Sequence, residues 1–331
     1  MEQKATKRTT GFVFLAVLAL LPGVFFAVSM GALKIEAADI INSIFHNTGT
    51  LEDMMIRDVR LPRAICVLVT GGILGMTGSL MQGVTRNPIA EPSLLGISQG
   101  ATLFVACFYA AGIGATTGNV MLAAFLGALL SGVMVLLFTM KNPGNMSITR
   151  LLLAGTAMST LFTALTTIAG LLSNQSQMIA FWVSGGFRNA SWLDVKIIVT
   201  AGVIGFTAAV FLSPKINILS LGDDVAVGLG EHPARVRLIT ILLVIPLCAA
   251  TVVVGKTIGF VGLMVPQTLR LLIGEDYRRI IPCSFLLGAL LLTYADLAAR
   301  LLYEPYEIPI GIFTALFGVP FFLAMAAKER G

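Results

Sequence analysis

Six hydroxyl side chains recur along one apolar segment, RLLLAGTAMSTLFTALTTIAGLL, at residues 150–172. They are Thr156, Ser159, Thr160, Thr163, Thr166 and Thr167, and steps of three and four place them on one helical face. Serine and threonine can donate to carbonyls of their own helix, which would make this face a packing stripe. The same face would suit the wall of an aqueous pathway, and the residue types leave both interpretations open.

Other residues with reactive side chains do not form a recognisable site. ATVVVGKT, at residues 250–257, contains the Gly-Lys-Thr of a phosphate-binding loop, but three valines precede Gly255 where the motif needs a Gly-rich loop. The four cysteines lie inside apolar runs without metal-ligand spacing, and two histidines, His46 and His232, are too few for a metal cluster. We expect no catalytic residue, no metal site and no bound cofactor.

The composition is that of a membrane protein. Hydrophobic residues make up 56% of the 331-residue chain and charged residues only 12%, about half the charged share of a soluble domain. Apolar runs of about twenty residues, the length of a membrane-spanning helix, recur along the chain. The sequence therefore predicts an all-α polytopic membrane protein with about ten transmembrane helices. The predicted spans are residues 11–32, 64–84, 93–113, 119–140, 151–173, 193–213, 238–256, 258–273, 280–300 and 309–327.

Two of these boundaries depend on particular residues. Residues 238–273 are too long for one crossing, and a lysine at the bilayer centre costs roughly 3 kcal/mol. We therefore place Lys256 at a tight turn between two helices. The basic start of the chain resembles a signal peptide, but its apolar run is long and lacks an A-x-A site, which favours an uncleaved first span.

The distribution of basic residues predicts the orientation. With the N-terminus inside, the inner segments hold 14 of the 22 lysines and arginines. This bias supports both termini in the cytoplasm and an even number of spans.

Two inner connections have unusual sequences. RNPIAEPSLLG, at residues 86–96, contains Pro88 and Pro92, which prevent the flanking spans from merging. It is either an ordinary turn or a gate at the end of a pathway, since non-helical backbone near a bilayer must be buried or line a cavity.

The longest inner connection is residues 219–237. Asp223 and Asp224 favour a helix start, Gly230 a left-handed end, and Pro233 the first turn of the next helix. These signals predict two short surface helices that a partner could contact, with a solvated loop as the alternative.

Three arginines, Arg60, Arg63 and Arg300, fall on the outer side, where basic residues are under-represented. Arginines at helix ends often extend their charged groups toward water. The alternative is that they receive acidic groups of a protein that docks from outside.

Six blocks together resemble the FecCD-type permeases, the membrane subunits of ABC importers for ferric siderophores, haem and cobalamin. They are RLPR, GSLMQGVTRNPIAEPSLLGISQGA, LGDDVAVGLG, GFVGLMVPQTLRLLIGEDYRRIIP, ADLAAR and EIPIGIFTALFGVPFF, in order over residues 60–327. The resemblance implies a type II ABC importer permease fold, with residues 1–331 as a single transmembrane permease domain in the cell membrane. It implies a dimer with an identical or paralogous permease, two cytosolic ATPase subunits that use ATP, and an external substrate-binding protein, but no nucleic acid.

The resemblance also implies roles for particular residues. The fifth span would line the pathway, and Arg60, Arg63 and Arg300 would meet glutamates of the binding protein. The cytoplasmic gate would comprise Asn87, Ile89 and Thr149. The ATPase-coupling residues would be Leu221, Gly222, Asp223, Asp224, Ala226, Leu229 and Gly230. Many relatives have histidine where this chain has Gln267, so no titrating role passes to that position.

Two other classes fit less well. An ion-coupled secondary transporter would have paired ionisable residues deep in its spans, and an intramembrane enzyme would need clustered reactive side chains. A ferric siderophore is the expected cargo, and haem or cobalamin are the alternatives within the same architecture.

Overall fold

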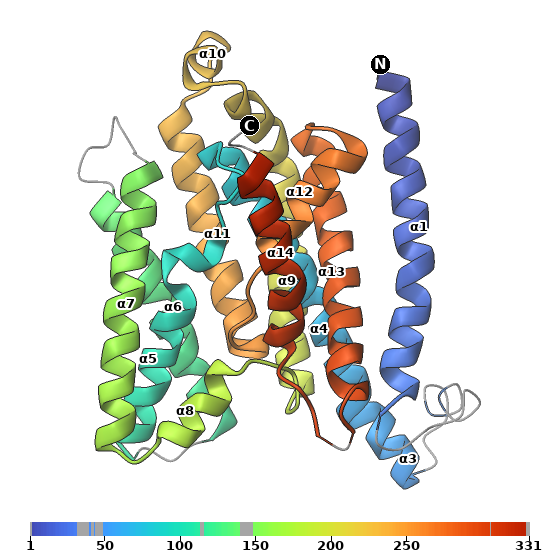
Figure 1. Ribbon diagram of the computed structural model, residues 1–331, viewed down its shortest axis with the longest axis vertical. Coiled ribbons are helices and arrows are strands. Elements are labelled where there is room, and N and C mark those ends of the chain that lie inside the picture. The colour runs from blue at the N-terminus through green and yellow to red at the C-terminus, as the bar shows by residue number, and fades with distance from the viewer. Residues whose placement is uncertain are drawn as a thin grey trace.

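The computed structural model describes residues 2–31, 40, 43, 49–112, 116–139, 148–304 and 306–328, and the ordered elements among these are all helical. The long helices run side by side along one axis (Figure 1). In chain order the elements are α1 Glu2–Ser29, α3 Leu51–Met54, the π-helical turn η1 Met55–Arg60, α4 Leu61–Thr85, the 3-10 turn η2 Pro92–Leu95, α5 Ile97–Ala110, α6 Thr117–Thr139, α7 Ile148–Leu172, α8 Ser176–Val183, α9 Trp192–Ser220, α10 Asp223–Gly228, α11 Pro233–Gly255, α12 Val261–Ile273, α13 Tyr277–Leu301 and α14 Ile310–Lys328.

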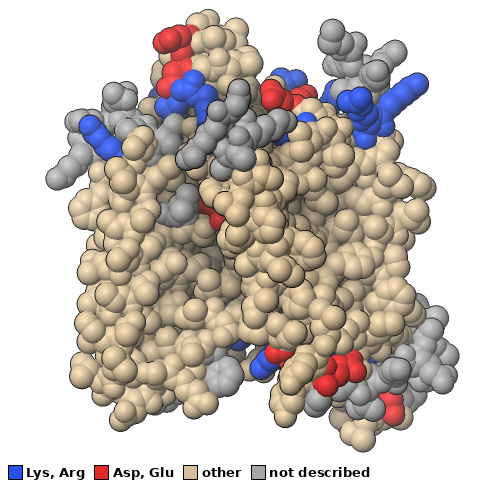
Figure 2. Space-filling model, viewed as in Figure 1, with Lys and Arg blue, Asp and Glu red and all other residues tan. Residues whose placement is uncertain are grey.

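Ten apolar helices match the ten predicted spans. In the described part of the chain, seven are long and apolar enough to cross a membrane, and three more, within α5, α12 and α14, are apolar but shorter. On the face shown in Figure 2, charged side chains gather at the two ends of the molecule and leave the band between them almost free. The ten-helix membrane architecture is confirmed. The short helix α8, in the connection after α7, was not predicted.

Two of the predicted spans are shorter than expected. The helices α5 and α12 have 14 and 13 residues, about 20 Å each, whereas the hydrocarbon core is about 30 Å thick. Each begins late because the backbone before it turns through a left-handed residue, Gly96 at φ 69° and Phe260 at φ 68°. Non-helical chain therefore precedes both helices inside the bundle, where Ala90 and Ile258 are buried. Such backbone is tolerated only inside protein or along a cavity.

The helix α4 forms the centre of the bundle and packs against α9, α11, α12 and α13. Its small residues Gly71 and Gly75 lie against the backbone of α13, and Gly78 lies against Gly262 of α12. A Cβ atom at any of these three glycines would overlap a carbonyl oxygen of the neighbouring helix. This close packing fixes α4 against the two helices that carry the sites described below.

The two ends of the bundle differ. Both chain termini and α10 lie at one end, and α3 and α8 lie at the other (Figure 1). Termini at the same end agree with an even number of crossings. The end with α10 is called the coupling end below, and the end with α3 and α8 the opposite end.

Candidate functional site

The hydroxyl face of α7 remains largely uncovered in the single chain. Thr156, Thr160, Thr163 and Thr167 are exposed, whereas Thr166 is buried. Five hydroxyls, all but that of Thr166, donate to carbonyls four residues earlier in α7, at 2.8–3.0 Å. Five of the six hydroxyls are thus satisfied within their own helix, and the buried hydroxyl of Thr166 has no partner among the described residues. The exposed ones form a weakly polar surface, and its role in a pathway stays a prediction.

The segment after α4 is held by two glutamines. Arg86 ends α4 in a left-handed conformation, and the Asn87 side chain accepts a hydrogen bond from the backbone N–H of Ile89 at 3.0 Å. The next carbonyl, that of Pro88, accepts from Nε2 of Gln267 at 3.0 Å. Nε2 of Gln267 also donates to Oε1 of Gln82 at 2.8 Å. Gln267 is therefore a neutral donor that fastens this segment to α12.

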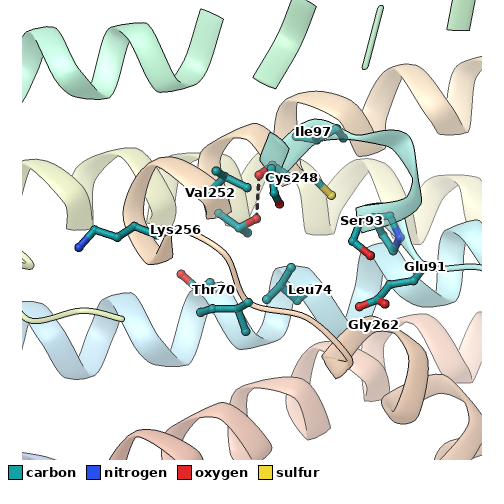
Figure 3. Close-up of a pocket in the computed structure, with 13 residues that line it drawn as sticks. Thr70, Leu74, Glu91, Ser93, Ile97, Cys248, Val252, Lys256 and Gly262 are labelled. Carbon is teal, nitrogen blue, oxygen red and sulfur yellow. Dashed lines mark hydrogen bonds between the residues drawn. The ribbon is translucent and has the colours of Figure 1, made fainter. Parts of the chain in front are cut away.

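Glu91 makes a second attachment to the same helix. Its carboxylate accepts from the backbone N–H of Phe260 at 2.7 Å, at the start of α12. Figure 3 shows Glu91 close to Ser93 and Gly262, beside a cavity of about 20 Å³ that Thr70 also lines. A space of this size is large enough for one water molecule. Residues 86–96 are thus fixed at two points against the beginning and middle of α12.

The third gate residue of the sequence prediction is on a different element from the other two. Thr149 is exposed in the first turn of α7. Ile89 is also exposed. Among the described residues, no hydrogen bond joins Thr149 to Asn87 or Ile89.

Asp223 connects α10 to α11 and to the end of α4. Its carboxylate accepts two hydrogen bonds from Arg237 of α11, at 2.7 and 3.0 Å, and an ion pair from Arg86 at 3.0 Å. Nε of Arg237 donates to the carbonyl of Val84, in the last turn of α4. The Asp223 carboxylate thereby joins the start of α10 to Arg86, the residue directly before Asn87.

The predicted helix signals in this connection are confirmed in part. Asp223 and Asp224 lie in the first turn of α10, and Gly230 follows it with φ 83°. The N–H of Glu231 returns to the carbonyl of Ala226, which completes a left-handed end. The prediction of two short helices was wrong, because Pro233 begins the long helix α11. The single short helix and its flanking residues carry exposed apolar side chains, those of Leu221, Val225, Val227 and Leu229.

The three outer arginines are buried and have partners inside the chain. Arg60 donates to the carbonyls of Val28 and Ser29, both at 2.8 Å. Arg63 pairs with Asp296 at 2.8 Å and with Glu307 at 2.7 Å. Arg300 pairs with Asp296 and donates to the carbonyl of Ala27, both at 3.1 Å. Each is less than a tenth exposed, so none extends its charge into water as isolated arginines do. Their contacts within the chain hold α1, α4 and α13 together at the opposite end.

The acidic partners of these arginines were missed by the sequence reasoning. Asp296 is four residues before Arg300 in ADLAAR, a spacing that pairs opposite charges on a helix. Glu307 carried no such local signal, since its partner Arg63 is 244 residues away. Burial opposes the charged form of Glu307, but hydrogen bonds from Arg63 and Arg188 hold the pKa of its carboxyl below the ordinary value. The two arginines therefore favour the ionised form of Glu307.

The remaining reactive residues have structural positions. Lys256 ends α11 with φ 60°, at the predicted turn between two helices. The four cysteines are free, and three of them are buried. His232 precedes the first residue of α11, and His46 lies outside the described residues.

Comparison with known proteins gives one consistent result. The model of the FecCD transport family matches residues 18–328. The iron(3+)-hydroxamate import system permease protein FhuB of Bacillus subtilis is 41% identical, over 99% of this chain and 87% of that protein. The ferric enterobactin permease FepD of Escherichia coli is 35% identical over 91% of each chain. The hemin permease HmuU of Yersinia pestis is 34% identical over 97% of this chain and 95% of that protein.

A solved structure agrees with these sequence matches. It is an inward-facing conformation of a putative metal-chelate type ABC transporter, which superposes with a TM-score of 0.83 at 28% identity. The superposition covers 98% of this chain and 99% of that one. The match therefore extends over the whole helical bundle.

Proposed function

The chain belongs to the FecCD transport family and is a membrane-spanning permease subunit of an ABC importer, and from this premise we propose that it imports a ferric siderophore as half of a permease dimer. The observation that carries the choice of cargo is the nearly full-length match, at 41% identity, to an iron(3+)-hydroxamate permease. Haem is the second candidate, because a hemin permease is 34% identical over 97% of the chain.

The exposed face of α7 supports a pathway at the boundary between two permease subunits. Its hydroxyls are already bonded to backbone carbonyls, so they give a polar wall that does not bind cargo strongly. A pathway must bind its cargo weakly enough to release it. Exposed apolar side chains on α14, among them Leu316 and Phe317, give a second surface that a partner subunit would cover. That subunit is an identical or paralogous chain.

The contacts around Asp223 support a route from an ATPase to the gate. In this proposal the cytosolic ATPase subunits, which bind and hydrolyse the ATP, press on the exposed apolar residues of α10. The movement passes through Asp223 to Arg86 and so to Asn87 and Ile89, which close the cytoplasmic mouth together with Thr149. The coupling residues are those predicted from the sequence, with Gly222 and Gly230 supplying the left-handed or extended backbone on either side of α10.

The opposite end is the proposed docking side for an external substrate-binding protein. With both termini in the cytoplasm, the end that carries α8 and Glu307 faces outward. The docking role proposed for Arg60, Arg63 and Arg300 has to coexist with their partners within the chain. Charge reversal at Arg63 would therefore leave Asp296 and Glu307 facing a third carboxylate, and it would unfold this end before it affected docking.

Transport by the reconstituted importer tests the proposal. The permease would be assembled with its ATPase subunits and binding protein in liposomes, and uptake of an ⁵⁵Fe-labelled trihydroxamate chelate would be measured with ATP inside. Haem and cobalamin serve as competing cargoes, and an ATPase variant that cannot hydrolyse ATP serves as the control. Uptake that needs ATP and favours the iron chelate supports the proposal, whereas uptake driven by an ion gradient without ATP would refute it.

A further inference from the structure

A large cavity lies at the opposite end, next to Lys256. Its volume is about 730 Å³, within the range of sites that enclose a small organic ligand. Side chains from α8, the connection after it, the end of α11 and the start of α14 line it. Lys256 also lines the small cavity beside Glu91, and Figure 3 shows its side chain pointing away from Glu91.

The carboxylates that line this cavity already have partners. Asp194 accepts from the N–H and hydroxyl of Ser191 at the start of α9. Asp296 pairs with Arg63 and Arg300, and Glu307 pairs with Arg63 and Arg188. Three cations, Arg63, Arg188 and Lys256, and these three carboxylates line the cavity. Among the described residues, the cation without a carboxylate in ion-pair distance is Lys256.

Trp182 and Arg188 also line this cavity, and each has a hydrogen-bond donor without an acceptor among the described residues. Nε1 of Trp182 is buried and has no acceptor among the described residues, and the Lys256 ammonium lies 5.9 Å from the centre of the Trp182 ring. Arg188 uses Nε and Nη2 for Glu307, which leaves the hydrogens of Nη1. Burial and the nearby charge of Arg188 lower the pKa of Lys256, and the charge of Asp194 acts in the opposite direction. The cavity thus offers unused donors and an ammonium group that has no carboxylate in ion-pair distance among the described residues.

We propose that Lys256, the indole N–H of Trp182 and Nη1 of Arg188 form a binding subsite for an anionic, oxygen-rich iron chelate, with its carboxylate or catecholate oxygens toward the lysine. The inference rests on the proposed import of ferric chelates and adds a charge preference to it. Acceptor oxygens of the chelate satisfy the buried indole donor, whose desolvation is otherwise uncompensated. The subsite disfavours cationic chelates, because they would meet an unpaired ammonium.

Fluorescence of Trp182 provides a direct assay. The chain has two tryptophans, so Trp192→Phe leaves Trp182 as the only one, and a bound ferric chelate would quench it. The complete importer in lipid nanodiscs would be titrated with ferric citrate, with a ferric tris-catecholate and with a neutral ferric trihydroxamate. We expect saturable quenching that is tighter for the two anionic chelates. Lys256→Met should raise their Kd about tenfold, with little change for the neutral chelate, and Lys256→Arg should restore most of the affinity.

The control is Lys196→Met, which removes an exposed lysine in the first turn of α9 that does not line the cavity. A Trp182→Phe variant that keeps Trp192 corrects for absorption by the chelate. Equal Kd values in Lys256→Met and Lys196→Met, or no saturable quenching by any anionic chelate, would overturn the subsite. ATP-driven uptake is measured on the same preparations. If ATP-driven uptake occurs but Lys256→Met does not change the Kd, the subsite is refuted and the transport function is not. If no iron chelate is taken up, the proposed transport function is refuted.

Discussion

Asp223→Ala tests the connection between α10 and the gate. The substitution removes the carboxylate that binds Arg237 and Arg86 and leaves the backbone of α10 able to form. Arg237 would remain buried, with its hydrogen bond to the carbonyl of Val84 but without a counter-charge. We expect the importer to assemble and hydrolyse ATP while transporting little cargo per ATP, because α10 then moves without carrying the end of α4.

The structure sets the size of the effect. The two-bond contact with Arg237 is charge-assisted and its arginine side chain is only 8% exposed, which corresponds to about 1.5–3 kcal/mol. In the ion pair between Arg86 and Asp223, the two side chains are 39% and 41% exposed, so this pair adds at most about 1 kcal/mol. A loss of about 2–3 kcal/mol raises the population with α10 detached by roughly 30- to 150-fold. Arg237→Gln should therefore reduce coupling more than Arg86→Gln.

The assay is the ratio of cargo taken up to ATP hydrolysed in proteoliposomes, with permease abundance measured in the same membranes. Glu275→Ala is the control, because Glu275 lies outside the coupling residues, is exposed and has no ion pair among the described residues. Wild-type coupling in Asp223→Ala, or an equal loss in Glu275→Ala, would show that the carboxylate bridge does not transmit the movement.

Three further predictions concern stability, the coupling end and topology. Asp296→Ala should destabilise the permease by about 3–5 kcal/mol, because the buried guanidinium groups of Arg63 and Arg300 lose their shared counter-charge. Thermal unfolding in detergent measures this loss, and Glu275→Ala, which removes an exposed acid, is the control. Equal melting temperatures of the two variants would contradict the prediction. Gly230→Val should cost about 1–2 kcal/mol of backbone strain at φ 83° and abolish cargo-stimulated ATP hydrolysis at normal abundance, whereas Gly228→Val, in a helical position with open space around it, should not. In a variant without the native cysteines, a cysteine at Asn189 should react with an impermeant thiol reagent from outside and one at Gly228 only after permeabilisation; external labelling at residue 228 would overturn the orientation.

The elements that were predictable carry their signals locally. Each span is an apolar run whose length is set by the bilayer, and the cap after α10 follows from an aspartate pair, a glycine and a proline within eleven residues. The turn at Lys256 was predictable for the same reason, since one charge in a long apolar run has few places to lie. None of these inferences needed to know which helices are neighbours.

Features that depend on neighbouring helices were not predictable in this way. The residue before α12, Phe260, is bonded to Glu91, which is 169 residues away. Composition alone could not show this contact, and it predicted a span that begins at residue 258 instead of Val261. The outer arginines are the clearest case. From sequence, Arg60 and Arg63 stood out because they lie on the side of the membrane where arginines are rare, and rarity suggested a partner outside the chain.

The fold supplies partners from within because α4 and α13 pack side by side through small residues. That close packing brings Arg63 to Asp296 and Glu307, although more than 230 residues separate them. Once these charges are buried together, removing one leaves another unpaired, so these arginines and their acidic partners depend on one another. Lys256 remains the exception at this end, since its charge has no carboxylate partner among the described residues. An unusual charge predicts a partner, and the packing decides whether the partner lies within the chain or arrives as a ligand.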